Sequence, residues 1–351
     1  MNAGTGQVLG ESAKPLDEDS WNVSSSVENM YSLVAGDELA AMGDERDDIL
    51  VMTADLMISN RTGDFQARHP DRFINVGIAE QNMVSMAAGL ATCGYIPYVS
   101  TFASFASLLC AEQMRTDLAY PGVPVRVLAH HAGVAMGFYG TSHHAVEDIA
   151  ITRAIANMTV VSAADAASLR AVLRSTLDVD GPVYIRFGRG REKPVYDAPP
   201  ALEHGKFVTV REGGDATIIA TGVSVLAAVD AAEILAAEDI DVRVLDAVYI
   251  KPLDRDAILA AASETGAILV SEEHSVIGGL GGAVCETIAR AGVSVPIDLH
   301  GLEDEYALIA PPTHLYRHYG FTGTGLAERT RRLLGQAPGE PTATNGQGVN
   351  G

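Results

Sequence analysis

Short runs of β-branched residues alternate with Ala-rich stretches of helical periodicity along most of this 351-residue chain. This alternation is typical of parallel sheets, because each strand must be followed by a helical crossover before the next strand can run in the same direction. In the first half, six apolar runs predict strands at residues 49–53, 73–76, 96–100, 125–129, 159–162 and 183–187. Helices are expected between them at residues 27–42, 79–92, 102–118, 145–155 and 166–177.

The pattern pauses over residues 191–214, which carry Pro194, Pro199 and Pro200, and then restarts. The second half predicts strands at residues 216–221, 242–246, 267–271 and 296–299, and helices at 225–237, 255–264, 281–291 and 325–334. We therefore expect an α/β protein with two tandem open, mostly parallel sheets. The expected division is a tail at 1–24, a first domain at 25–190, a linker at 191–214, a second domain at 215–335 and a second tail at 336–351.

The charge balance narrows the choice of partners. The chain has 24 Lys and Arg against 45 Asp and Glu, a formal charge of −21. This charge opposes broad binding to a nucleic-acid backbone or an anionic membrane, so we expect neither partner. The uncharged stretch from Gln81 to Ala111 is interrupted by Gly94, Pro97 and polar residues, which argues against a membrane span. The three cysteines lack the spacing of a metal site, and the amino terminus lacks the pattern of a secretion signal. We therefore expect a cytoplasmic location.

Open parallel sheets bind ligands beyond the carboxyl ends of their strands, so the loops at those ends are the candidate sites. Glu80 begins a predicted helix after the second strand and is the only charged residue between Arg72 and Glu112. The helix dipole alone accounts for a carboxylate at this position. The alternative is a functional acid, held in an apolar setting, that exchanges a proton with a heterocycle nitrogen.

Aromatic and imidazole side chains follow the next two strands. Phe102 and Phe105 lie three residues apart, which indicates either core packing or a platform for a flat aromatic ligand. A histidine-rich stretch contains two doublets, at positions 130 and 131 and at positions 143 and 144. Adjacent residues of an extended strand point to opposite faces, so we expect no metal site and favour hydrogen-bonding or proton-transfer roles for these histidines.

Arginines and glycines mark two further loops. Arg186, Arg189 and Arg191 follow the sixth strand and indicate either a local anion site or a solvated loop end. The run GGLGG at 278–282 resembles a dinucleotide-binding loop, but it lacks the required strand, turn and acidic partner. We do not predict a dinucleotide site there.

Taken in order, four motifs resemble the pyrimidine-binding domain of the transketolase family: Ile-Ala-Glu-Gln-Asn at 78–82, Ser-Thr-Phe at 100–102, Gly-Thr-Ser-His-His at 140–144, and Arg189. The strings VLDAVYIKPLD at 244–254 and EEHSVIGGLGGAV at 272–284 are similar to the carboxyl-terminal domain of that family. The resemblance covers about residues 27–335. It implies a thiamine diphosphate-binding fold.

Full-length family members hold the cofactor diphosphate and magnesium through a Gly-Asp-Gly motif in a preceding domain. The nearest string here, Ala-Gly-Asp-Glu at 35–38, has Glu in place of the second Gly. The chain therefore resembles the carboxyl-terminal subunit of a split transketolase. The resemblance implies a separate amino-terminal subunit that supplies the diphosphate and Mg²⁺ site, in an α2β2 heterotetramer.

The resemblance also implies roles for individual residues. Glu80 would bond the cofactor's aminopyrimidine ring as a protonated carboxyl. The other residues implied to contact the cofactor are Phe102, Phe105 and, more weakly, Asp55. The residues implied to contact substrate are His131, Tyr139, His143, His144 and Arg189, with His143 nearest the reacting carbon.

Three substrate positions depart from the family pattern. Tyr139 stands where full-length transketolases have an aspartate that contacts a substrate hydroxyl, Ser142 replaces Thr, and His144 replaces Gln. The cofactor positions match. The resemblance thus supports thiamine chemistry more strongly than it supports the usual pentose phosphate substrates.

The expected activity is transfer of a two-carbon ketol unit from a ketose, expected to be phosphorylated, to an aldose acceptor. Two other enzyme classes share this domain order: the beta subunit of a 2-oxoacid dehydrogenase and a deoxyxylulose phosphate synthase-like condensing enzyme. The motifs at 100–105 and 142–148 favour transketolase. A noncatalytic assembly subunit is the alternative outside enzymes, and the joint presence of Glu80, Phe102, His143 and Arg189 argues against it.

Overall fold

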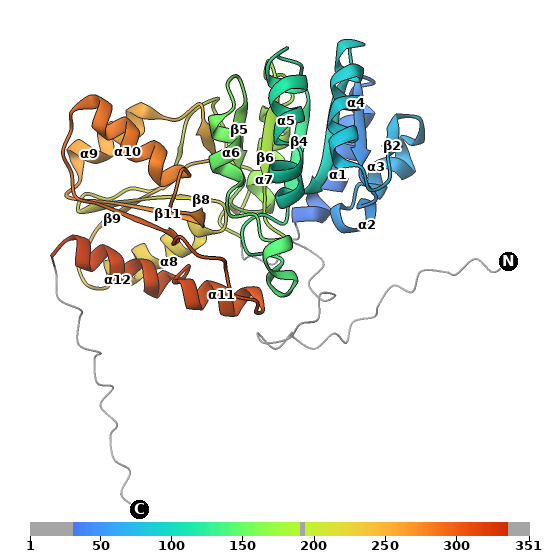
Figure 1. Ribbon diagram of the computed structural model, residues 1–351. Coiled ribbons are helices and arrows are strands. Elements are labelled where there is room, and N and C mark those ends of the chain that lie inside the picture. Colours follow the sequence, from blue (N-terminus) through green and yellow to red (C-terminus); the bar gives the residue numbers. More distant parts are fainter. Residues whose placement is uncertain (1–30, 190–193, 336–351) are drawn as a thin grey trace, which may run out of the picture.

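The computed structural model describes residues 31–189 and 194–335. The two predicted tails, residues 25–30 of the first predicted domain and Arg191 lie outside these residues. Two sheets lie side by side, the first built from the amino-terminal half and the second from the carboxyl-terminal half (Figure 1). Both are mostly parallel and flanked by helices, as the alternating pattern predicts.

The first sheet has seven strands in the order β10-β5-β6-β4-β3-β1-β2. All neighbours run parallel except β10, which is antiparallel to β5. The strands are β1 (Ile49–Thr53), β2 (Phe73–Asn75), β3 (Ile96–Phe102), β4 (Arg126–His130), β5 (Thr159–Ser162), β6 (Val183–Arg186) and β10 (Tyr249–Lys251). Their near-continuous apolar character follows from burial on both faces.

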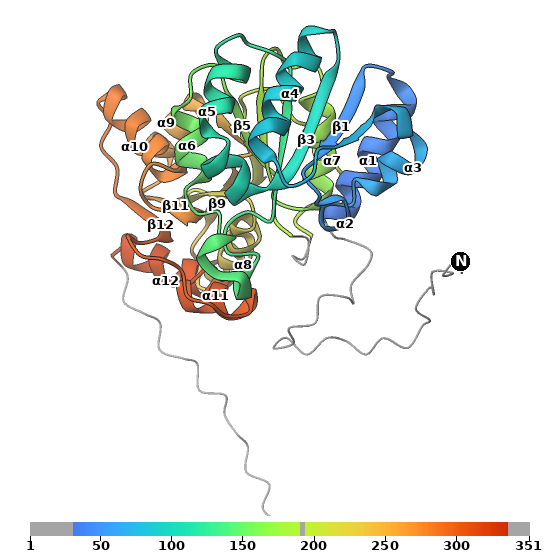
Figure 2. The same ribbon diagram turned by 45° about the vertical axis from the view of Figure 1, so that its right-hand side comes forward.

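Helices cover both faces of this sheet (Figures 1 and 2). One face packs against α1 (Tyr31–Glu45) and α7 (Ala166–Ser175). The other packs against α4 (Glu80–Thr92), α6 (Asp148–Ala154) and the segment 105–119. Short helical elements complete the half: α2 (Met57–Asn60), α3 (Gly63–Arg68), η1 (Pro70–Arg72) and η4 (Gly137–Ser142).

The second sheet has five strands in the order β12-β11-β8-β9-β7, with β7 antiparallel at one edge. The strands are β7 (Val208–Arg211), β8 (Ala216–Thr221), β9 (Val242–Asp246), β11 (Ile268–Ser275) and β12 (Ile297–Leu302). Helices α8 (Ser224–Ala236) and α12 (Gly323–Leu333) pack on one face, and α9 (Arg255–Glu264) and α10 (Leu280–Ala291) on the other. Helix α11 (Pro312–Tyr319) lies beside η4 of the first half.

Several elements differ from the prediction, including the short helices α2 and α3, which were not expected. β7 lies inside the predicted linker, and β10 crosses from the second half into the first sheet. The helix expected over 102–118 starts later, because β3 continues to Phe102; wide π-type turns at η2 (Phe105–Leu109) and η3 (Met114–Ala119) then flank the short α5 (Ala111–Gln113). Helix α11 was not predicted. β10 has three residues and β7 four, too few for the period of a strand to stand out.

Buried charges join the two halves. Asp148, at the start of α6, accepts hydrogen bonds from Arg186 Nε at 2.9 Å and from the Tyr184 hydroxyl at 3.0 Å, and all three side chains are buried. Arg186 Nη2 also donates to the carbonyl oxygen of Glu273 in β11 at 2.8 Å. The predicted contribution of Arg186 to a ligand-anion site is therefore wrong, because its charge is paired inside the protein.

The glycine-rich run at 278–282 holds an internal carboxylate. Glu272 accepts hydrogen bonds from the backbone N–H groups of Leu280 and Gly281, both at 2.7 Å, at the start of α10. A Cβ at Gly279 would clash with that carboxylate. The glycines therefore allow a side chain of the protein to occupy the helix N-terminus. Elsewhere, no helix in 31–189 or 194–335 has the length and apolar character needed to cross a membrane.

Candidate active site

The predicted site residues gather at the carboxyl ends of β2, β3 and β4, which lie on the same edge of the first sheet. Glu80 is the first residue of α4 and is only 9% exposed. Its carboxylate has no hydrogen-bond partner among the residues that the structure describes. The carboxylate oxygens are not among the fully buried polar atoms that lack a partner, so an external donor can reach them.

One hydrogen bond and one electrostatic interaction place the start of α4 beside the segment that carries Phe105. Gln81 Nε2 donates to the carbonyl oxygen of Leu109 at 2.9 Å. Burial, with a smaller contribution from the Glu80 carboxylate, raises the pKa of Cys110 to about 12. The start of α4 and the η2 turn thus form one corner of the site.

Phe102 is the centre of a cluster of rings. It is the last residue of β3 and lies opposite His130 of β4 in the strand register. Its ring centroid is 5.5 Å from that of Phe105, 4.9 Å from His130, 5.0 Å from His131 and 5.4 Å from His143. These edge-to-face contacts fix the ring orientations. The structure therefore brings three of the predicted site residues, Phe105, His131 and His143, together around a fourth, Phe102.

The first histidine doublet differs from the prediction of opposed side chains. His131 has a left-handed backbone, with φ of 59°, so the two rings meet with their Nδ1 atoms 2.5 Å apart. Burial lowers the pKa of His130 to about 3. The pKa of His131 is also well below its usual value, because of burial and the neighbouring His130. Both rings are neutral near pH 7, and one donates its proton to the other.

The second doublet separates into two environments. His143 contacts Phe102 and Phe105 and stacks on Tyr139 with ring centroids 4.7 Å apart, while Ser142 Oγ lies 2.9 Å from its Nδ1. Burial lowers the pKa of His143. The His144 ring is instead buried within its own loop, with Nε2 3.1 Å from the carbonyl oxygen of Gly137. Partial burial also lowers the pKa of His144.

The remaining predicted residues lie further around the edge. Asp55, just after β1, is exposed with φ of 61°; its backbone N–H donates to Asn75 Oδ1 at 3.1 Å. Arg189 follows β6, is half-buried, and places its guanidinium carbon 5.9 Å from the ring centroid of Phe138. Asp55 and Arg189 thus mark the β1 and β6 ends of the candidate site.

Sequence reasoning missed a second layer of acids that holds the histidine loops. Glu273 Oε1 accepts from the backbone N–H of Val134 at 2.8 Å, and Gly133 lacks the Cβ that would clash with this carboxylate. Asp148 fixes Arg186 behind the loop. Two adjacent carboxylates in an apolar strand, as at 272 and 273, were the available signal, because buried charges require specific partners.

No group of three or more His, Cys, Asp or Glu side chains in the described part of the chain is arranged to hold a metal ion. The groups present at this edge are the carboxylates of Glu80 and Asp55, the Arg189 guanidinium, imidazoles and aromatic rings. Such a set suits a flat heteroaromatic ligand that accepts a proton and packs against apolar faces.

The fold and this edge define a class of α/β proteins that bind a ligand at the carboxyl ends of parallel strands. Family comparison identifies the class directly: residues 28–193 match the transketolase pyrimidine binding domain, and residues 205–326 match the transketolase C-terminal domain. The chain belongs to the transketolase family.

Relatives of similar length are named as a transketolase section, a transketolase subunit and a split gene transketolase. The chain is 39% identical over 296 residues to a putative transketolase C-terminal section of Methanocaldococcus jannaschii, covering 84% of this chain and 93% of that protein. It is 38% identical over 286 residues to a 6-deoxy-6-sulfo-D-fructose transketolase subunit of a Clostridium strain, covering 82% and 88%. A split gene transketolase, solved as an inactive β4 tetramer, superposes with a TM-score of 0.79 at 39% identity, covering 87% and 98%.

Deoxyxylulose phosphate synthases are also related. The 1-deoxy-D-xylulose-5-phosphate synthase of Thermomicrobium roseum is 35% identical over 339 residues, which cover 93% of this chain and 54% of that enzyme. The split transketolase subunits match at higher identity and over most of their own length. The transketolase interpretation of the motifs is therefore confirmed.

The pyrimidine-binding domain implies dependence on thiamine diphosphate. The residues fit the pyrimidine end of that cofactor: Glu80 offers a buried carboxylate without a described partner, and Phe102 and Phe105 offer apolar ring surface. His130 Nε2 and Ser104 Oγ are buried without hydrogen-bond partners at the same edge. Unpaired polar atoms of this kind are compatible with a polar ligand or ordered water.

Proposed function

We propose that this chain supplies the pyrimidine-binding half of a thiamine diphosphate site and that a separate subunit supplies the other half. The observation that carries the proposal is the buried Glu80 carboxylate, which faces the candidate site without a described partner. We assign Glu80 as the acid that holds a proton at a nitrogen of the aminopyrimidine ring. Phe102 and Phe105 would pack against the ring.

Thiamine diphosphate, when bound, supplies the carbon nucleophile that cleaves the donor's carbon–carbon bond. The residues of this chain would bind, orient and protonate. The pKa values of His143 and His131 are lowered, so both rings are neutral near pH 7. Because Nδ1 of each ring is already bonded within the protein, each has its Nε2 left for one hydrogen bond to a substrate oxygen. Arg189 would contact a substrate phosphate, because a guanidinium matches phosphate geometry. Asp55 would lie near the cofactor at the subunit boundary.

The substrate departs from the usual pentose phosphates in this proposal. Tyr139 presents a half-exposed ring stacked on His143, where an aspartate would present a charge. His144 is turned into its loop and would act on substrate only through the position of His143. Because the matched relatives are named as transketolases, we propose a ketose donor and an aldose acceptor. We propose that the donor is phosphorylated because the Arg189 guanidinium suits a phosphate.

The need for a partner is supported by the apolar surface around the site. Ile78, two residues before Glu80, is 84% exposed. Other large apolar side chains on α4, the η2 turn and the neighbouring loops are also exposed: Met86, Leu108, Leu109, Tyr120 and Tyr139. Surfaces of this kind mark protein interfaces. We propose an amino-terminal subunit here, which binds the diphosphate and Mg²⁺, in an α2β2 heterotetramer.

We propose a cytoplasmic location. Cys93, Cys110 and Cys285 are all free thiols in the structure, which suits a reducing compartment.

A donor screen tests the function. The chain would be co-expressed with a candidate amino-terminal subunit, loaded with thiamine diphosphate and Mg²⁺, and offered ketose phosphates or pyruvate, each with an aldehyde acceptor. Ketol transfer from ketose phosphates alone supports the proposal. Condensation from pyruvate would move the chain to the deoxyxylulose phosphate synthase class, and oxidative decarboxylation would move it to the 2-oxoacid dehydrogenases. A saturated complex without turnover of any donor would favour a noncatalytic assembly subunit.

A further inference from the structure

A second pocket lies between the two domains, beside the edge strand β10 of the first sheet. Its volume is about 590 Å³, and it is lined by α6 of the first domain and by β10, α9 and α10 of the second. Lys251 lies opposite Val160, near the amino end of β5, whereas the catalytic edge is formed by carboxyl ends. The pocket is therefore separate from the catalytic edge.

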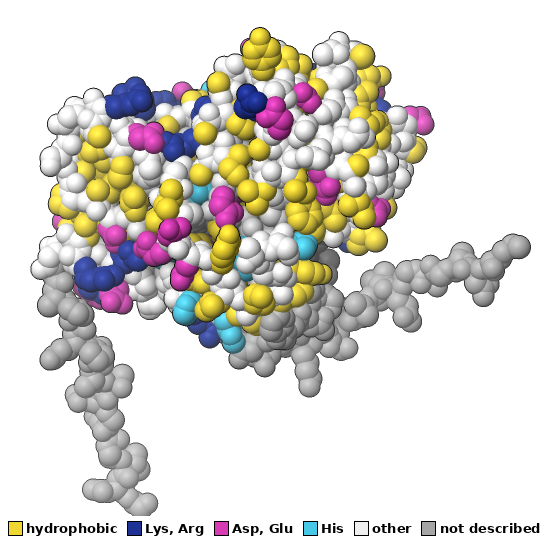
Figure 3. Space-filling view, in the orientation of Figure 1, with side chains coloured by type: hydrophobic (Ala, Val, Ile, Leu, Met, Phe, Trp, Pro, Cys, Tyr) yellow, Lys and Arg dark blue, Asp and Glu magenta, His cyan; other side chains and the backbone are white. Residues whose placement is uncertain are grey.

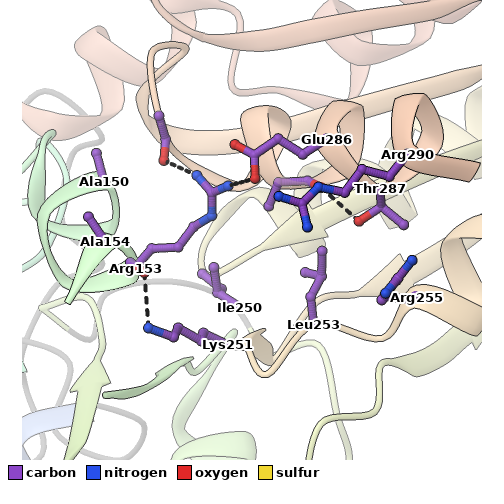
Figure 4. Close-up of a pocket in the computed structure, with 12 residues that line it drawn as sticks. Ala150, Arg153, Ala154, Ile250, Lys251, Leu253, Arg255, Glu286, Thr287 and Arg290 are labelled. Carbon is purple, nitrogen blue, oxygen red and sulfur yellow. Dashed lines mark hydrogen bonds and ion pairs between the residues drawn. The ribbon is translucent and has the colours of Figure 1, made fainter. Parts of the chain in front are cut away.

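Positive charge dominates this pocket in a chain whose formal charge is −21. Four of its lining residues are cations, Arg153, Lys251, Arg255 and Arg290, and one is an acid, Glu286. Figure 4 shows these side chains around one cavity, and Figure 3 shows basic side chains gathered on the same part of the surface, near α9 and α10. The cations come from four different elements, so the fold brings them together.

Two of the cations are held in place by hydrogen bonds. Arg153 Nη1 donates to the carbonyl oxygen of Gly278 at 2.7 Å, and its other terminal nitrogen pairs with Glu286. Lys251 Nζ donates to the carbonyl oxygens of Arg153, at 3.1 Å, and of Ile155. Burial and the charge of Arg153 lower the pKa of Lys251. These contacts orient the two cations, and Glu286 is the only carboxylate among the residues lining the pocket.

The other two cations, Arg255 and Arg290, form no ion pair within the described residues. Arg290 lies in the last turn of α10, where the helix dipole favours a positive charge. Arg255 is the first residue of α9, where the dipole disfavours one. A bound anion would reduce the repulsion among the four cations of the pocket.

We propose that this pocket binds the phosphate group of a small phosphorylated molecule. Guanidinium groups bind phosphate through paired, charge-assisted hydrogen bonds, and Arg255 and Arg290 have donors available for them. Ile250 and Leu253 line the same cavity and provide apolar surface for an organic body attached to the phosphate. Because Arg153 belongs to the first domain and Arg255 and Arg290 to the second, the bound phosphate would link the two domains.

Calorimetric titration of the full chain at low salt tests the proposal, with inorganic phosphate and glycerol 3-phosphate as probes. The test variant is Arg255→Gln with Arg290→Gln. Both side chains are exposed, so we expect the variant to fold with an unchanged unfolding midpoint. The matched control is Arg115→Gln with Arg332→Gln, which removes the same charge from exposed positions outside this pocket.

We expect saturable binding of at least one probe, weakened about tenfold or more in the test variant and unchanged in the control. Tighter binding of glycerol 3-phosphate supports an organic phosphate, and equal binding supports recognition of the phosphate group alone. Equal loss in both double variants, or no saturable binding to the wild-type chain, would overturn the proposal. Activity is not the readout, so the result is independent of the proposed function.

Discussion

Two regions of the molecule bury carboxylates: the catalytic edge, where Glu80 lies, and the joint between the domains, where Asp148 and Glu272 lie. The carboxylates differ in whether they have a partner within the protein. At the joint, Asp148 is paired with Arg186 and Tyr184, and Glu272 is paired with two backbone N–H groups of α10. At the edge, Glu80 is buried without a partner among the described residues. A partnered buried charge contributes to the fold, whereas a mostly buried carboxylate without a protein partner is available to a ligand. The difference separates structural acids from the acid that we assign to the cofactor.

The largest expected effect comes from removing the acid at the edge. Glu80→Gln in the reconstituted pair should lower kcat for ketol transfer by about 10²- to 10⁴-fold, the usual range for loss of a general acid or base. The free energy of unfolding of the isolated chain should change little, because no described hydrogen bond is lost. Steady-state kinetics and urea unfolding measure the two effects. Near-normal turnover of the Glu80→Gln variant would contradict the proton-holding role that we assign to Glu80.

A substitution at the joint between the domains should lower the stability of the isolated chain, unlike the substitution of Glu80. Arg186→Leu leaves Asp148 buried without its charged partner, so the free energy of unfolding should fall by about 3–5 kcal/mol. Urea unfolding of the isolated chain measures this loss. Arg332→Gln, at an exposed position, is the control and should change the value by less than about 0.5 kcal/mol. A small effect of Arg186→Leu would show that the joint tolerates an unpaired acid. Pairing would then no longer distinguish the acids of the joint from Glu80.

The buried pair His130 and His131 predicts that the free energy of unfolding depends on pH. The folded pKa of His130, about 3, is below its unfolded value, so unfolding takes up a proton when the pH falls below about 6.5. Stability is full above that value and falls between about pH 6.5 and 3. From pH 7.5 to 5.0 this histidine should reduce the free energy of unfolding by about 2 kcal/mol.

His131 shifts in the same direction and adds to the loss. Urea unfolding at the two pH values measures the total, and His130→Gln should make the dependence shallower. An identical pH dependence in this variant would mean that His130 is charged or solvated in the folded protein.

The smallest expected effect concerns the substrate position that departs from the family pattern. Tyr139→Ala removes the ring stacked on His143, an interaction of about 0.5–1.5 kcal/mol, so KM for the donor should rise by about 2- to 12-fold. Tyr139→Phe keeps the ring and should retain the wild-type KM. Equal KM values in all three proteins would place Tyr139 outside the substrate site.

The sequence predicted the two sheets well, because parallel strands with helical crossovers produce a strong repeating pattern. Most strand starts agree with the structure to within one residue, as at β1, β5, β8 and β9. The alternating sequence pattern did not predict strands that pair with a segment far away in the chain. β10 contributes three residues to a sheet built from the other half, and only the folded chain brings Tyr249 opposite Val161.

The ring cluster was partly predictable for a similar reason. Phe102, Phe105 and His143 follow strands whose carboxyl ends meet at one edge, so their convergence follows from topology. The contact between His130 and His131 was not predictable, because it depends on a left-handed residue outside glycine. The burial of Arg186 depends on Asp148, 38 residues earlier in the chain, and its charge alone indicated a ligand site.

The central claim is that this chain holds half of a cofactor site. The direct test is calorimetric titration of thiamine diphosphate, with Mg²⁺ present, into this chain, into the candidate amino-terminal subunit and into their equimolar mixture. We predict tight binding, at one cofactor per pair of subunits, only in the mixture, and a weakening of that binding by Glu80→Gln. Equally tight binding to this chain alone would contradict the account.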